Sequence, residues 1–75
     1  MLVDYGTLLR MHRRRQAISQ TELAVAMGRT NACWISRREA GVIAMDRAEY
    51  TAAIAAIEAL AKARTEAANL EEALA

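Results

Sequence analysis

Residues 18–41 read ISQTELAVAMGRTNACWISRREAG, and this stretch decides how the chain folds. Ser19 is followed three residues later by Glu22. This is the spacing of a capping box, in which each residue's side chain bonds the other's backbone N–H at the start of a helix. The pattern therefore predicts a helix that begins at Gln20 and buries Leu23.

Two glycines in this stretch stand where helices are expected to end. Gly28 and Gly41 lack a Cβ atom, so each can take the left-handed conformation that closes a helix sharply. Thr30 is a candidate N-cap for the helix between them, which is expected to end near Glu39. Two short helices joined by a turn at residues 28–30 follow from this spacing.

The flanking sequence predicts one helix before this pair and one after it. Asp4 is a candidate N-cap for a helix that runs to about Arg15. Asp46 and Glu49 repeat the capping-box spacing, which starts a last helix at Arg47.

The last helix is expected to be much longer than the others. From Arg47 to Leu74 the chain has 28 residues without glycine or proline, equivalent to a helix of about 42 Å. One apolar stripe, Tyr50, Ile54 and Ile57, is expected to cover the preceding helices. A second stripe has nothing left within the chain to bury it and is interpreted as a homodimer interface. It consists of Leu60, Ala63, Ala67, Leu70 and Leu74.

Length and composition favour one all-α domain. The chain has 75 residues, no proline, no phenylalanine and three glycines, so strands are hard to place. Residues 1–46 are expected to form the core with its pair of short helices joined by a turn, and residues 47–75 the long helix that completes the core and dimerises.

Several classes of site are not expected from the sequence. Cys33 is the single cysteine, which leaves no internal disulfide and no thiolate zinc site. No metal-ligand cluster, glycine-rich phosphate loop or pair of core carboxylates is recognisable, so no enzyme, catalytic residue, metal, cofactor or small-molecule ligand is expected. No stretch resembles a membrane span or signal peptide, and a cytoplasmic location is expected.

The charge is distributed unevenly along the chain. Residues 1–48 carry eight arginines and four acidic residues, a net charge of +4, whereas residues 49–75 carry two basic and five acidic residues, a net charge of −3. Arginine is the side chain best suited to bidentate phosphate and guanine contacts. A basic first half therefore favours a polyanionic partner.

Residues 8–60 resemble the lambda-repressor-like (Xre-type) helix-turn-helix family. The resemblance rests on a pattern similar to LSQxxLAxxxG followed by xxxISRxExG, with an arginine at the end of the preceding helix. The matching residues are Arg13, Ser19, Gln20, Leu23, Ala24, Gly28, Ile35, Ser36, Arg37, Glu39 and Gly41. Two features depart from the family: the interval from Gly28 to Glu39 is one residue longer, and Arg38 replaces an apolar residue.

The resemblance implies double-stranded DNA as partner, with the third helix in the major groove. Gln20 and Thr21 would bond backbone phosphates. Asn31 would pair with adenine and Arg37 with guanine. The full set expected at the DNA is Gln20, Thr21, Arg29, Thr30, Asn31, Ala32, Cys33, Trp34, Ser36 and Arg37.

Some of these residues have alternative interpretations. Arg14 and Arg15 either contact phosphates or simply complement the helix dipole. Trp34 either touches a thymine methyl or sugar or packs against a neighbouring helix. Cys33 is interpreted as a buried or semi-buried thiol rather than a redox switch, and His12 as a partly buried core residue.

The resemblance implies further that Arg13 pairs with Glu39. It also implies a transcriptional regulator, a repressor or autorepressor, that binds a palindromic operator as a homodimer, with half-sites about one helical turn (roughly 10 bp) apart. The competing hypothesis is an antitoxin or adaptor whose long helix binds a different protein.

Overall fold

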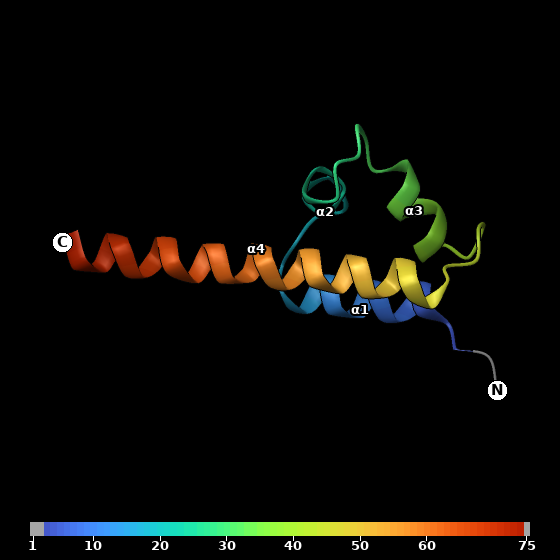
Figure 1. The fold of residues 1–75 in the computed structure, drawn as a ribbon, viewed down its shortest axis with the longest axis horizontal. Coiled ribbons are helices and arrows are strands. Elements are labelled where there is room, and N and C mark those ends of the chain that lie inside the picture. The colour runs from blue at the N-terminus through green and yellow to red at the C-terminus, as the bar shows by residue number, and fades with distance from the viewer. Residues whose placement is uncertain (1–2, 75) are drawn as a thin grey trace.

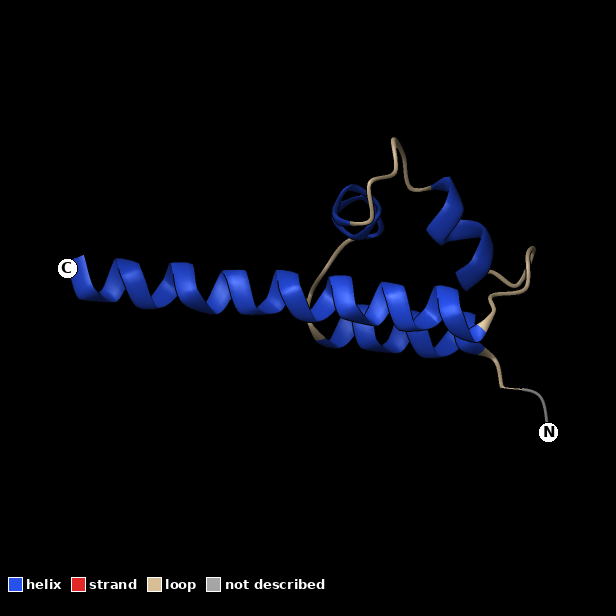
Figure 2. Ribbon diagram, viewed as in Figure 1, coloured by secondary structure: helices blue, strands red, loops and turns tan. Residues whose placement is uncertain are grey.

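The computed structural model describes residues 3–74. Within these residues the chain forms four helices joined by loops, with no strand (Figure 2). The all-helical prediction is therefore confirmed at this level. The helices are α1 (Tyr5–Arg15), α2 (Gln20–Ala26), α3 (Cys33–Glu39) and α4 (Arg47–Leu74).

Local capping fixes three of the four helix starts at the predicted positions. The carboxylate of Asp4 accepts from the Thr7 backbone N–H at 3.1 Å. In α2 the Ser19 hydroxyl accepts from the Glu22 N–H at 3.0 Å, and the Glu22 carboxylate accepts from the Ser19 N–H at 3.1 Å. The same reciprocal pair begins α4. The Asp46 carboxylate accepts from the Glu49 N–H at 2.7 Å, and the Glu49 carboxylate accepts from the Asp46 N–H at 3.0 Å.

The predicted start of α3 is wrong by two residues. Its N-cap is Ala32, which makes no side-chain capping bond, and Thr30 does not cap the helix. Instead, Asn31 Oδ1 accepts from the Cys33 backbone N–H at 2.9 Å. This side-chain-to-backbone bond forms an Asx turn, which extends the connection before the helix begins.

The helices α1 and α3 approach each other closely at Gly6. A Cβ atom at this position would lie 2.0 Å from the Arg38 carbonyl oxygen. The buried face of α1 accordingly runs through Gly6, Leu9 and Arg13, and Leu8 is 36% exposed.

Gly28 and Gly41 both have φ of +77°, as expected for glycines that end helices.

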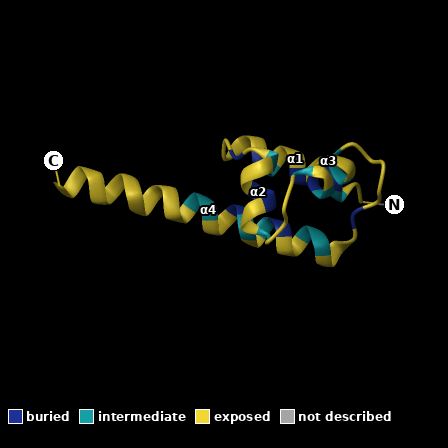
Figure 3. Ribbon diagram, turned by 90° about the horizontal axis from the view of Figure 1, so that it is seen from above, coloured by how far each residue is buried: buried dark blue, intermediate teal, exposed yellow. Residues whose placement is uncertain are grey.

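All four helices contribute to one apolar core, where the buried segments gather in Figure 3. The helix α4 lies beside α1, with α2 and α3 packed across them (Figure 1). The buried apolar residues are Leu9, Ile18, Leu23, Ala24, Ile35, Met45, Ala53 and Ile57.

The second half of α4 extends well beyond this core, and the molecule is 49 Å long (Figure 1). We call residues 62–74 the arm; all of them are exposed. The expectation that nothing in the chain covers the second stripe is wrong for Leu60, which packs against the core. None of the helices in residues 3–74 combines the length and apolar character needed to cross a membrane.

Candidate nucleic-acid interface

An ion pair joins α1 to the end of α3. Arg13 donates from Nε and Nη2 to the two carboxylate oxygens of Glu39, both at 2.8 Å. Its Nη1 donates to the Ile18 carbonyl oxygen at 2.8 Å. The hydrogen bond to Glu39 raises the pKa of Arg13. The predicted pair is thus confirmed, and it fixes the orientation of α3 against α1.

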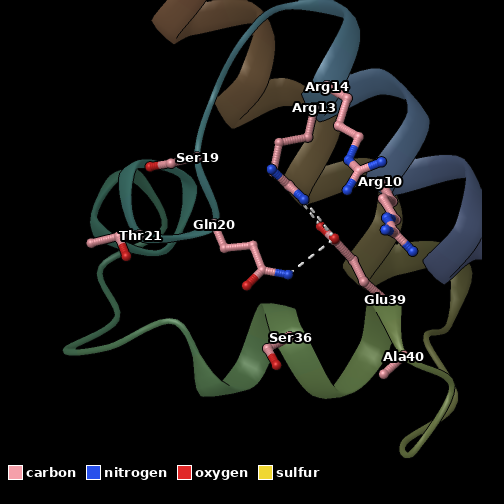
Figure 4. A pocket seen from close by; sticks show the side chains of 9 residues that line it. All are labelled: Arg10, Arg13, Arg14, Ser19, Gln20, Thr21, Ser36, Glu39 and Ala40. Atoms are coloured by element: carbon pink, nitrogen blue, oxygen red, sulfur yellow. Dashed lines mark hydrogen bonds and ion pairs between the residues drawn. The ribbon is translucent and has the colours of Figure 1, made fainter.

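Gln20 belongs to the same network. Its Nε2 donates to Glu39 Oε1 at 3.2 Å, as the dashed line in Figure 4 shows. The side chain that the sequence assigned to a phosphate contact is therefore already bonded through its amide nitrogen. Three elements, α1, α2 and α3, meet at Glu39.

A pocket of about 600 Å³ opens beside this network, between α1, α2 and α3 (Figure 4). Its lining is almost entirely polar or charged. The residues that line it are Arg10, Arg13, Arg14, Ser19, Gln20, Thr21, Ser36, Glu39 and Ala40. The hydroxyl-bearing and amide side chains come from α2, its N-cap Ser19 and α3, and the arginines come from α1.

The pocket carries a net positive charge. The guanidinium of Arg13 is neutralised by Glu39, whereas Arg10 and Arg14 are exposed and form no ion pair within residues 3–74. These two arginines are four residues apart, so they lie on the same face of α1. Such a pair attracts an anionic group to the pocket.

Five residues that line this pocket were not among the predicted DNA contacts: Arg10, Arg13, Ser19, Glu39 and Ala40. Arg10 is the one of them that adds an unneutralised charge. A signal was present, because Arg10 and Arg14 have the spacing of neighbours on a helix face. Arg15, the other phosphate candidate, is exposed but does not line the pocket.

Most residues expected to read bases lie on the surface of α3 and of the loop before it. Thr30, Asn31, Cys33, Ser36 and Arg37 are exposed, and Ala32 is half-buried. The expectation of a buried or semi-buried thiol at Cys33 is therefore wrong. Cys33 is the first residue of α3 and follows an exposed loop, so the core does not cover its side chain.

The Trp34 side chain packs against other residues of the domain and is not fully exposed to solvent. It is half-buried against the core, with the guanidinium carbons of Arg29 and Arg38 at 4.4 and 4.0 Å from its ring centroid. Arg38 also donates to Glu49 from Nε at 3.3 Å and from Nη2 at 3.0 Å. Arg38 therefore combines stacking on Trp34 with an ion pair to α4.

Two further predictions concern residues away from this surface. His12 is half-buried, as predicted, with its ring edge-on to Tyr50 at 6.3 Å between centroids. At the base of the arm, Arg64 donates to the carbonyl oxygens of Gln16 and Ala17 at 3.2 and 3.0 Å and pairs with Glu22.

Exposed basic and polar side chains thus surround the α2–α3 connection and the adjacent pocket, while the carboxylate at their centre is already neutralised. No family model, curated protein or solved structure matches the chain, so these side chains and their geometry are what indicate its function.

Proposed function

We propose that this chain is a sequence-specific DNA-binding regulator of transcription, acting as a repressor or autorepressor. The observation that carries the proposal is the pair of unneutralised arginines, Arg10 and Arg14, beside the exposed outer surface of α3. Phosphate contacts position such a protein on DNA, and side chains in the major groove read the sequence.

The pocket receives a backbone phosphate in this proposal. Arg10 and Arg14 supply the positive charge from α1, and Thr21 and Ser36 supply hydroxyl donors from α2 and α3. The hydrogen bond to Glu39 fixes the orientation of the Gln20 side chain, so Gln20 can contribute to phosphate binding with little loss of side-chain entropy.

The outer surface of α3 reads the bases. Arg37 is exposed on α3 and suits guanine, whose O6 and N7 accept a bidentate guanidinium. Asn31 suits adenine only if its amide oxygen leaves the Cys33 N–H, because a bidentate contact uses both amide atoms. The present geometry therefore favours Arg37 as the principal reader. Two copies of the chain would occupy the two halves of a palindromic operator.

The phosphate pocket is tested by removing its charge. The Arg10→Gln, Arg14→Gln double variant lowers the net charge by two, and Lys62→Glu lowers it by the same amount on the distant arm. Fluorescence anisotropy with labelled duplex DNA, first selected from a random pool, measures affinity at several salt concentrations.

We expect the double variant to weaken binding to all sequences and to reduce the slope of log K against log salt by about 1, roughly 0.9 for the one phosphate that the pocket no longer neutralises. The Lys62→Glu control should keep nearly the slope of the native chain. Equal losses in the two variants would mean that only net charge matters and would overturn the pocket assignment. If no duplex is enriched in the selection, the proposed function itself is wrong.

A further inference from the structure

The arm carries apolar side chains that are exposed to solvent and that the rest of the domain does not cover. Leu70 and Leu74 are 61% and 80% exposed, and Ala63 and Ala67 are exposed with them. We call these four residues the arm stripe. At about 100° per residue the stripe lies roughly a quarter turn around α4 from the core-facing Ala53 and Ile57, so a partner can lie along it without displacing the domain.

We propose that the arm stripe packs antiparallel against the arm stripe of a second copy, with each leucine opposite an alanine. This inference rests on the proposed function only in taking a second copy as the partner. In this register Leu70 faces Ala67 of the second copy, and Leu74 faces its Ala63. All four layers then combine a large and a small side chain, the arrangement that fills a helix interface evenly.

Charges beside the stripe favour this orientation. In an antiparallel pair, equivalent flanks of the two helices face each other, which brings Glu71 toward Arg64 of the second copy on both sides of the two-fold axis. Arg64 already pairs with Glu22, so a second carboxylate would share a guanidinium that the domain holds in place.

A parallel pair is disfavoured by the same residues. It would bring Glu66 of each copy beside Glu71 of the other, two like-charged contacts. It would also stack alanine on alanine in two successive layers. A second antiparallel register, which places Leu60 opposite Leu70 of the other copy, is also disfavoured. It brings Arg64 beside Arg64 and Glu66 beside Glu66. In addition, Leu60 already packs against its own core.

The arrangement has a consequence for DNA. Ala53 in the two copies would lie about 46 Å apart along the arms, at about 1.5 Å per residue. Successive major grooves on one face of DNA are only about 34 Å apart. The Arg38–Glu49 ion pair holds α3 beside the start of α4, farther from the arm than Ala53. Arms that lie along the DNA axis therefore require half-sites farther apart than the single turn that the resemblance implies.

A distance measurement tests the orientation without DNA. Ala55 is exposed on α4 outside the arm, and an Ala55→Cys variant in a Cys33→Ser background carries one nitroxide label per chain. The proposed dimer puts the two labels about 40 Å apart along the arms, and the Leu60–Leu70 register puts them about 30 Å apart. In a parallel dimer the axes are 8–10 Å apart and the labels would be within about 20 Å.

A charge reversal gives a second readout with opposite signs for the two orientations. Glu71→Lys should weaken an antiparallel dimer several-fold by facing Arg64, but would tighten a parallel one by facing Glu66. Glu72→Lys makes the same charge change away from the stripe and should leave the dimer constant nearly unaltered in analytical ultracentrifugation.

A pulsed electron spin resonance distance near 40 Å together with weakening by Glu71→Lys would support the proposal. Distances near 30 Å or below 20 Å, tightening by Glu71→Lys, or a monomeric mass at millimolar concentration would overturn it. A chain that dimerises in this way but enriches no duplex would leave the arm assignment standing and refute the regulatory function.

Discussion

Removing one partner of the Arg13–Glu39 pair should cost more stability than removing both. The two side chains are only 10% and 3% exposed, so Glu39→Leu leaves a guanidinium in the interior without its carboxylate, and Arg13→Leu leaves the carboxylate without its guanidinium. Breaking a buried ion pair in this way costs about 3 to 5 kcal/mol, whereas replacing both charges by apolar groups can be nearly neutral.

The total free energy of unfolding sets the scale of this loss. At about 0.05 to 0.15 kcal/mol per residue, a chain of 75 residues has about 4 to 11 kcal/mol. Either single variant should therefore lose a large fraction of its stability, and the double variant should recover part of it. Glu39→Gln keeps one acceptor for the guanidinium and should be milder, so it remains measurable if the leucine variants do not fold.

Urea unfolding followed by far-UV circular dichroism measures all four corners of the double-mutant cycle. We expect a coupling of about 2 kcal/mol or more, since hydrogen bonds to charged groups contribute roughly 1.5 to 3 kcal/mol. The exposed pair of Lys62 and Glu66, 78% and 67% exposed, provides the matched control, with a coupling of at most about 0.5 kcal/mol. Additive losses at Arg13 and Glu39 would refute the view that this pair holds α3 against α1.

Three further predictions concern other parts of the molecule. Gly6→Ala should lower the melting temperature, because overpacking against Arg38 costs about 1 to 3 kcal/mol and exceeds the gain in helix propensity of about 1 kcal/mol; an unchanged melting temperature would show that α1 and α3 are less closely packed. Backbone hydrogen bonds within the capping boxes lower the pKa values of Glu22 and Glu49. The two ionised carboxylates therefore contribute fully to the free energy of unfolding above the ordinary pKa of 4.5, and this contribution is lost as the pH falls below it. Urea midpoints measured between neutral and acidic pH should decline less in the Glu22→Gln, Glu49→Gln variant. Arg37→Ala should cost about 1 to 3 kcal/mol on the selected DNA and much less on random DNA, and equal losses on the two in anisotropy titrations would make it a phosphate contact.

The helix starts that sequence reasoning predicted correctly are those governed by local chemistry. Capping boxes at Ser19 and Asp46 involve residues three positions apart, so their outcome depends little on the rest of the fold. The start of α3 was misplaced because two local motifs compete there. The Asn31 amide bonds the backbone two residues ahead, and Thr30 is left outside the helix.

Contacts between distant segments were harder to predict. Nothing in the sequence around Gly6 indicates that the Arg38 carbonyl lies against it, because that approach depends on how α3 crosses α1. Arg38 was recognised as an unusual residue, but its stacking on Trp34 and its pairing with Glu49 require the relative positions of two helices. The Arg13–Glu39 pair was an exception, since family resemblance supplied the long-range contact.

The packing of Trp34 gives the protein an intrinsic optical reporter. Trp34 is the only tryptophan in the chain, and two guanidinium groups lie over its indole ring. The emission spectrum of the whole protein therefore originates next to the surface proposed to meet DNA, and changes in it will report rearrangement of α3 or of the loop that carries Arg29. Stopped-flow fluorescence can follow DNA association on unmodified protein, without an added dye.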